Sequence, residues 1–125
     1  MNEPVEPYAS KALEALAGAQ SELSAARHNN AANRAYYAAY HAAIAVLIRA
    51  GHTSRDNVWG HDEVKARFAR ELIHSRKLFP SDFASVLYDL MEARLRADYG
   101  LRPVSRSLAE SRTRLAERFV RRLLE

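Results

Sequence analysis

The longest run of hydrophobic residues lies between Asn33 and Gly51. From Ala35 to Ile48, the only residue in this run that is not apolar is His41. The large side chains recur three, four and seven positions apart, which is the spacing of one face of an α-helix. They are Tyr36, Tyr37, Tyr40, Ile44, Leu47 and Ile48, and alanines occupy most of the opposite side. Because such a helix can be packed from both sides, we expect it to be the central helix of a helical bundle.

Four other segments show the same helical periodicity, with turn residues between them. The expected helices lie at about 7–27, 61–77, 82–98 and 107–124, and the central helix at about 30–51. Asn30 is the expected N-cap of the central helix, and Gly51 is expected to end it. Ser107 and Glu110 have the spacing of a capping box at the start of the last helix.

The sequence shows no strand alternation, no internal repeat and no domain linker. It therefore predicts an all-α fold, an up-and-down bundle of about five helices that forms a single domain over residues 1–125. With 125 residues, of which 48% are hydrophobic, the chain is long enough to bury a core.

Several classes of chemistry are missing from the sequence. It contains no cysteine, which excludes disulfides, thiolate catalysis and cysteine-based zinc sites. No histidine pair has helical metal-binding spacing and no glycine-rich phosphate loop is present, so neither a metal nor a cofactor is expected. The N-terminus lacks a secretory pattern and the apolar run is too short to span a bilayer. We therefore expect a cytoplasmic protein without a membrane segment.

Positive charge is concentrated toward the C-terminus. The net charge is +4, and only Lys11, Lys65 and Lys77 are lysine, so most of the basic residues are arginine. Nine arginines face four acidic residues from Arg94 onward. Arginine binds phosphate through a planar fork, which favours a nucleic-acid partner. The alternative is a GC-rich genome, which encodes arginine in place of lysine.

The fourth expected helix carries two charged residues in line with its apolar stripe. Phe83, Leu87 and Leu90 fall on one side of the helix, and Arg94 and Asp98 continue that side toward its end. An unpaired charge buried there would cost about 3–5 kcal/mol. The two side chains must therefore pair, be hydrated or lie at a subunit interface.

Two interpretations of this pair are open. The first is an i,i+4 ion pair that closes the end of the apolar stripe and needs no function. The second is a polar pocket in which Arg94 is a fixed cation, Asp98 orients it and Tyr99 adds a hydroxyl at the rim. An arginine held in this way can stabilise the extra charge of a phosphorane-like transition state.

Polar residues of the central helix are candidates for the same pocket. Arg34, Tyr37 and His41 are three, four and seven positions apart and so share one edge of the helix. His61 begins the next expected helix, where it has either a capping role or a role in proton transfer. These four residues form the expected supporting part of the site.

Three motifs, in order along the chain, resemble the short single-domain HEPN proteins of bacteria and archaea. The first is Arg-x-Tyr-Tyr-x-x-x-His, here from Arg34 to His41. The second is a helix that starts with histidine, here His61, and the third is Arg-x-x-Ala-Asp-Tyr, here from Arg94 to Tyr99. The resemblance extends over nearly the whole chain.

The resemblance implies a helical bundle that forms a homodimer. Many HEPN proteins are metal-independent endoribonucleases, often toxins encoded beside a nucleotidyltransferase antitoxin, and two protomers join their active residues in one cleft. In the mechanism proposed for them, the RNA 2′-hydroxyl attacks the adjacent phosphate and leaves a cyclic phosphate. The resemblance thus makes Arg94 the phosphate-stabilising residue, beside Asp98 and Tyr99, in a toxin–antitoxin or defence setting with RNA as substrate.

The sequence departs from the family pattern at one position. In HEPN ribonucleases a histidine follows the active arginine by four to six residues, and here Tyr99 stands in that place. A tyrosine, with a pKa of about 10, is a poor general base at neutral pH. His41 is one candidate substitute. The alternative is a non-catalytic HEPN module that binds a nucleotidyltransferase partner or a nucleotide, and a purely structural bundle is the third hypothesis.

Overall fold

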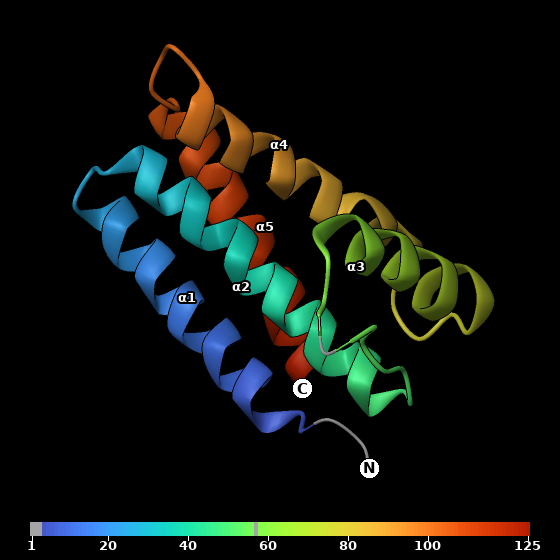
Figure 1. The fold of residues 1–125 in the computed structure, drawn as a ribbon. Helices are drawn as coiled ribbons and strands as arrows, with labels where there is room; N and C mark the ends of the chain where they lie inside the picture. Colours follow the sequence, from blue (N-terminus) through green and yellow to red (C-terminus); the bar gives the residue numbers. More distant parts are fainter. Residues whose placement is uncertain (1–3, 57) are drawn as a thin grey trace.

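The computed structural model describes residues 4–56 and 58–125, and within them the helices form one bundle (Figure 1). The α-helices are α1 Glu6–Ser24, α2 His28–Arg49, α3 His61–Arg67, α4 Val86–Tyr99 and α5 Arg106–Leu124. A π-helical segment, η1 Phe68–Ser75, continues α3, and a 3-10 segment, η2 Ser81–Ser85, leads into α4. The described residues form no β-strand, so the expected all-α fold is confirmed.

Helix α2 is the centre of the bundle. It lies between α1 and α4 and packs against α5 behind it (Figure 1). Eight of its alanines have no exposed surface: Ala31, Ala32, Ala35, Ala38, Ala39, Ala42, Ala43 and Ala45. Because alanine ends at Cβ, neighbouring helices can approach the α2 backbone closely on these positions. The prediction of a central helix packed from both sides is therefore confirmed.

The C-terminal end of α2 is closed by a glycine, as expected. Gly51 has a φ of 99°, and its N–H donates to the carbonyl of Ile48 at 2.9 Å. The N–H of His52 donates to the carbonyl of Leu47, also at 2.9 Å. This pair of bonds is a Schellman motif, in which glycine adopts the left-handed conformation without steric cost.

The expected N-cap of α2 is wrong. The helix begins at His28, so Asn30 lies inside its first turn and does not cap it. The neighbouring Asn29 has a tertiary role instead, because its Oδ1 accepts the backbone N–H of Val104 at 2.8 Å. This bond ties the start of α2 to the connection between α4 and α5.

Helix α5 also begins earlier than expected. Its N-cap is Ser105, whose Oγ accepts the backbone N–H of Leu108 at 3.1 Å. The expected capping box at Ser107 is wrong by two residues, and Glu110 instead pairs with Arg106 at 2.7 Å. The sequence pattern was misleading because Ser107, which lies inside the helix, has a glutamate three residues later. The true cap, Ser105, does not.

The helix expected at 61–77 is present, but its second half is wider than an α-helix. Segment η1 makes bonds across five residues, such as the one from the N–H of Arg76 to the carbonyl of Glu71 at 3.1 Å. Phe68, Leu72 and Ile73 are buried from this segment. Over eight residues their spacing does not distinguish a π-helix from an α-helix.

Helix α4 buries the stripe that its sequence predicted. Phe83 in η2 is 3% exposed, and Leu87 and Leu90 in α4 are 1% and 0% exposed. The helix ends at Gly100, where an added Cβ would lie 2.5 Å from the carbonyl oxygen of Arg96. Only a glycine therefore fits this close approach of the backbone, and the stripe continues as far as the charged pair discussed below.

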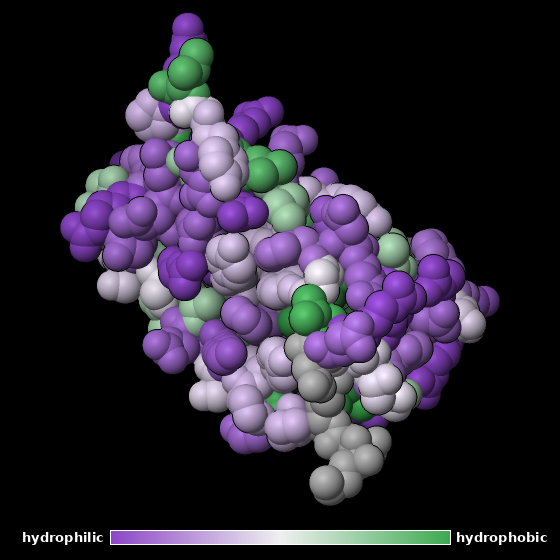
Figure 2. Space-filling view, viewed as in Figure 1, coloured by the Kyte–Doolittle hydropathy of each residue, from purple (hydrophilic) through white to green (hydrophobic). Residues whose placement is uncertain are grey.

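One face of the bundle is mostly hydrophilic. Figure 2 shows polar residues over most of one face, with hydrophobic residues at the protruding connection between α4 and α5. Leu101 in this connection is fully exposed. Among the described helices, none has the length and apolar character needed to cross a membrane.

The two serines near the start of α5 provide a test of the helix boundary. We expect Ser105→Ala to lower the free energy of unfolding by about 1 kcal/mol, because the N–H of Leu108 loses its acceptor. Ser107→Ala is the matched control and should be neutral or slightly stabilising, since alanine is the better helix former. Urea denaturation measures both, and a larger loss for Ser107→Ala would contradict the observed cap.

Candidate functional site

The charged pair of α4 lies against the N-terminal half of α2. Nε of Arg94 donates to Oδ2 of Asp98 at 2.9 Å, and the two side chains are 18% and 26% exposed. The guanidinium carbon of Arg94 lies 5.5 Å from the centre of the Tyr37 ring. Its Nη1 also approaches the sulfur of Met91 at 3.8 Å. The pair is therefore held between two helices instead of extending into solvent.

Asn33 on α2 holds the carboxylate of Asp98 from the other side. Its Nδ2 donates to both carboxylate oxygens at 3.1 Å. Its Oδ1 accepts from Nη2 of Arg34 at 2.7 Å and from Nε at 3.0 Å. Because the donor and acceptor ends of the amide are both used, these contacts fix its orientation. The sequence pattern did not predict Asn33. The signal that could have identified it is its position four residues before Tyr37, on the same side of the helix.

His61 lies beside the same surface of α2, among its tyrosines. Its Nδ1 is 2.5 Å from the hydroxyl oxygen of Tyr36, and its ring stacks on that of Tyr40 with centres 4.5 Å apart. The Tyr37 ring lies edge-on at 6.1 Å. Since Tyr37 also contacts Arg94, it connects the histidine with the charged pair.

Burial and neighbouring charge set the protonation of this cluster. Burial lowers the pKa of His61, and the positive charge of Arg94 lowers it further. Burial raises the pKa of Tyr40 to about 12 and also raises the pKa of Tyr36. At neutral pH the histidine is therefore mostly a neutral imidazole, and both tyrosines are neutral phenols.

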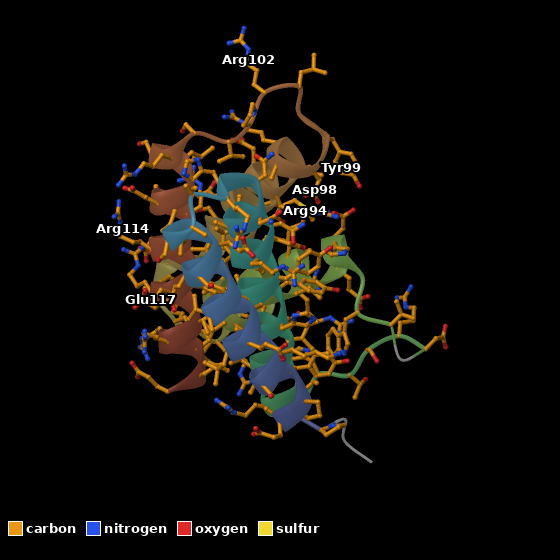
Figure 3. All side chains as sticks on the ribbon, turned by 90° about the vertical axis from the view of Figure 1, so that its left-hand side faces the viewer. Arg94, Asp98, Tyr99, Arg102, Arg114 and Glu117 are labelled. Atoms are coloured by element: carbon orange, nitrogen blue, oxygen red, sulfur yellow. The ribbon has the colours of Figure 1, made fainter. Side chains whose placement is uncertain are left out.

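Tyr99 lies outside this cluster. It is 74% exposed, and its hydroxyl makes no hydrogen bond to residues 4–56 or 58–125. Figure 3 shows Arg94, Asp98 and Tyr99 together near the end of α4, with Tyr99 furthest along the helix. The side chain of Tyr99 is thus open to solvent beside the Arg94–Asp98 pair. It is Asn33, and not Tyr99, that binds the carboxylate of Asp98.

Arg34 and His41 open onto a different hollow. A cavity of about 360 Å³ between α1 and α2 is lined by both side chains, together with Lys11 and Glu14 of α1. At about 100° per residue, Arg34 and His41 lie nearly in line on α2, whereas Tyr37 is rotated away from both by about 40–60°. Sharing one edge of a helix therefore did not place all three in one pocket.

The four expected supporting residues are thus divided between two places. Tyr37 and His61 lie with Arg94, whereas Arg34 and His41 line the cavity beside α1. The two places are still connected, because the guanidinium carbon of Arg34 lies 5.1 Å from the centre of the Tyr37 ring. Burial and the charge of Lys11 lower the pKa of His41.

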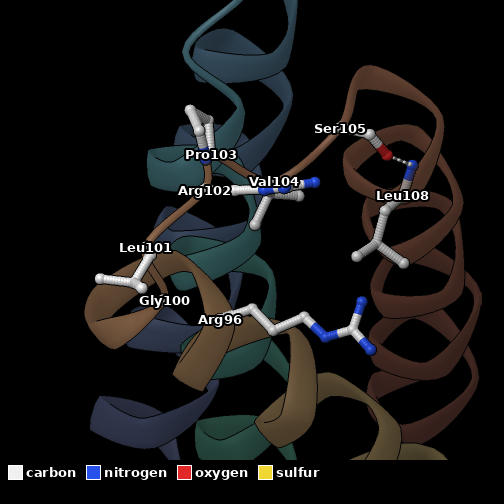
Figure 4. Close-up of a pocket in the computed structure, with 8 residues that line it drawn as sticks. All are labelled: Arg96, Gly100, Leu101, Arg102, Pro103, Val104, Ser105 and Leu108. Atoms are coloured by element: carbon white, nitrogen blue, oxygen red, sulfur yellow. Dashed lines mark hydrogen bonds between the residues drawn. The ribbon is translucent and has the colours of Figure 1, made fainter.

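A larger hollow shares no residue with the charged pair. It has a volume of about 520 Å³ and lies between the end of α4 and the start of α5 (Figure 4). Arg96 and Arg102 line it with apolar side chains such as Val104 and Leu108. Arg96 is on the outer face of α4 and pairs with Glu92 at 3.5 Å.

Most arginines of the C-terminal quarter are paired with carboxylates. Six of the nine form ion pairs at 2.7–3.7 Å: Arg94, Arg96, Arg106, Arg118, Arg121 and Arg122. Within the part of the chain that the structure describes, Arg102, Arg112 and Arg114 have no ion-pair partner. Figure 3 shows Arg102 at the tip of the bundle and Arg114 on α5, both away from Arg94. The positive charge is therefore largely compensated where it occurs.

These features define an all-helical bundle with one half-buried arginine–aspartate pair that faces tyrosines and a histidine. Within residues 4–56 and 58–125, no group of three or more His, Asp or Glu side chains is placed to hold a metal ion. The HEPN domain model matches residues 5–125, and the chain belongs to the HEPN family. HEPN domains typically dimerise and are often ribonucleases or associated with nucleotidyltransferases. A search of curated proteins found no match to the chain.

The half-buried histidine of α2, His41, predicts a pH dependence of stability. Because the folded-state pKa of His41 lies below its unfolded value of about 6.5, the unfolded chain binds a proton more readily. Stability should therefore be complete above this pH and fall as the pH decreases below it. His41→Gln should reduce the slope, measured as urea midpoints between about pH 5 and 8. The exposed His74→Gln is the control, and an unchanged slope in His41→Gln would contradict the assignment.

Proposed function

We propose that this protein is a HEPN toxin-type, metal-independent endoribonuclease that acts on RNA at a homodimer cleft, in a toxin–antitoxin or defence setting. The observation that carries the proposal is the placement of Arg94. Its side chain is 18% exposed and its Nε is held by Asp98 at 2.9 Å, and Asp98 is held in turn by Asn33. A cation fixed before the substrate arrives needs no reorganisation when charge develops on the substrate.

The free edge of the guanidinium supports a phosphate-binding role. Asp98 occupies Nε, and Nη1 has only the weak contact with the sulfur of Met91. Nη2 makes no hydrogen bond to the described residues, so two donor groups are available to a phosphate oxygen. In this proposal Arg94 stabilises the charge of the transition state, Asp98 orients Arg94, and Tyr99 contacts the substrate from the rim.

The outer face of α4 supports the homodimer. Tyr88, Leu95 and Tyr99 are seven and four residues apart, so they share one face of the helix. They are 48%, 45% and 74% exposed, and apolar side chains of this size are often covered by a partner subunit. A second copy packed on this face would cover these three side chains.

One observation favours a second candidate function. No histidine follows Arg94 along α4, and Tyr99 in that place is an exposed phenol. A site with a fixed cation and without a base on the same helix suits binding as well as catalysis. The alternative is therefore a non-catalytic HEPN module that uses the same site to bind a nucleotidyltransferase partner or a nucleotide.

Two arginines on nearly opposite faces of α4 test the ribonuclease proposal. The purified protein should cleave single-stranded RNA in the presence of EDTA, and Arg94→Ala should reduce the rate by about 100-fold or more, because the phosphate charge loses its cation. Arg96→Ala is the matched control, since Arg96 lies two residues away on the exposed face, and it should retain activity. Gel electrophoresis of labelled RNA measures the cleavage rates.

Folding and assembly need to be followed in the same samples. Circular dichroism and gel filtration should show that both variants keep the helical content and the oligomeric state of the parent. RNA that stays intact with the parent protein at high concentration would contradict the ribonuclease proposal. Co-elution with a nucleotidyltransferase, lost in Arg94→Ala but not in Arg96→Ala, would then support the binding module.

A further inference from the structure

We infer that His61 accepts the proton of the attacking RNA 2′-hydroxyl, with Tyr36 as the positioning residue beside its Nδ1. The inference rests on the proposed ribonuclease function and assigns the general base that α4 does not supply. The geometry that carries it is the contact of Nδ1 with the Tyr36 hydroxyl, next to a Tyr37 ring that touches both His61 and Arg94.

Three other candidates for a general base, Asp98, Tyr99 and His41, are already engaged or face elsewhere. The carboxylate of Asp98 accepts bonds from Arg94 and from Asn33 on both oxygens. Tyr99 is an exposed phenol beyond the cluster. His41 lines the cavity beside α1. His61 is therefore the imidazole that lies on the same side as Arg94, although it belongs to a different helix.

The two ring nitrogens of His61 have different surroundings. Nδ1 is 2.5 Å from the Tyr36 oxygen, whereas Nε2 makes no hydrogen bond to the residues that the structure describes. The Tyr36 hydroxyl can either donate to Nδ1 or accept from it. In the tautomer with the proton on Nδ1, Nδ1–H donates to the Tyr36 oxygen and the lone pair of the neutral ring is on Nε2. The stacking of the ring on Tyr40 at 4.5 Å holds Nε2 in a defined direction. In that tautomer, these contacts leave Nε2 free to accept a proton.

The charged and titratable groups around His61 come from three helices. They are Tyr36, Tyr37, Tyr40 and His41 on α2, Asp62 and Lys65 on α3, and Arg94 on α4. Burial and the charge of Arg94 lower the pKa of His61, while Asp62 opposes the shift. The neutral, proton-accepting form is therefore favoured at neutral pH.

The step balances without a metal or a cofactor. The 2′-hydroxyl proton moves to Nε2 of His61, the 2′-oxygen forms a bond to phosphorus, and the bond between phosphorus and the 5′-oxygen breaks. Arg94 faces the phosphate oxygens, which carry the additional negative charge in the transition state. The 5′-oxygen takes a proton from water, His61 returns its proton to solvent, and the products are a 2′,3′-cyclic phosphate and a 5′-hydroxyl.

The experiment compares histidine variants of the full-length protein with labelled RNA in EDTA. His61→Ala should lower kcat by about 100-fold or more, the usual contribution of a general base, and added imidazole should restore part of the rate. His61→Gln, which keeps a polar group beside Tyr36, serves if the alanine variant does not fold. His74→Gln is the matched control, because its side chain is exposed on η1, and it should behave like the parent.

The pH profile separates a proton-transfer role from a packing role. In the parent, kcat/KM should fall at acid pH as His61 becomes protonated, and this limb should disappear in His61→Gln. Tyr36→Phe should lower kcat with little change in KM and move the limb to lower pH, because the imidazolium loses the oxygen that accepts its Nδ1–H. RNA with a 2′-deoxy group at the cleavage position should bind the His61 variants as tightly as the parent.

The outcomes distinguish this assignment from the proposed function. Loss of cleavage in His61→Ala, with rescue by imidazole and normal activity in His74→Gln, would support the assignment. If cleavage requires Arg94 but His61→Gln keeps both the rate and the fall of kcat/KM at acid pH, the role of His61 is overturned. The proposed ribonuclease function would then still stand. A parent protein that does not cleave RNA would overturn both.

Discussion

Two buried tyrosine hydroxyls on α2 constrain the structure around the site. Tyr36 has no exposed surface and Tyr40 is 7% exposed, so their hydroxyls need partners inside the protein. Tyr36 bonds His61, and Tyr40 donates to the backbone carbonyl of Trp59. Both partners belong to the short segment that enters α3. An unsatisfied buried hydroxyl costs about 1–3 kcal/mol, so this segment is held in place by the core itself. The position of His61 is thus a consequence of packing on α2, and not of the loop that precedes it.

The need to give buried polar groups partners also explains how the bundle tolerates a charged pair in line with its apolar stripe. An i,i+4 ion pair alone would leave carboxylate lone pairs unsatisfied on the side that faces α2. Asn33 fills that side with two bonds to Asp98, while Tyr37 covers the guanidinium of Arg94. The ion pair therefore belongs to a polar cluster that also includes Asn33 and Tyr37. Asp98 engages only Nε of Arg94, so the outer edge of the guanidinium stays open.

Periodicity was sufficient to predict the central helix and the line of Arg94 with the apolar stripe, because both depend on spacing within one helix. It did not predict Asn33, whose partner Asp98 lies 65 residues away and becomes a neighbour only when α2 and α4 pack. It also did not separate His41 from Tyr37, because a shared helix edge does not say which neighbouring helix each side chain meets. The N-cap at Ser105 was missed because the nearby box pattern was closer to the consensus. These failures arise where tertiary contacts, not local spacing, decide the outcome.

The number of arginines and the way they are paired lead to different conclusions about where the protein could bind RNA phosphates. The excess of arginine in the C-terminal quarter suggested a broad phosphate-binding surface, but most of these side chains are paired with carboxylates at 2.7–3.7 Å. Surface ion pairs contribute little to stability, at about 0–1 kcal/mol each, so their main effect is to reduce the local field. Arg94 differs because its partner is itself held by a third group and its outer edge stays free. Recognition of a phosphate is therefore better supported at this single prepared cation than over the basic helix as a whole.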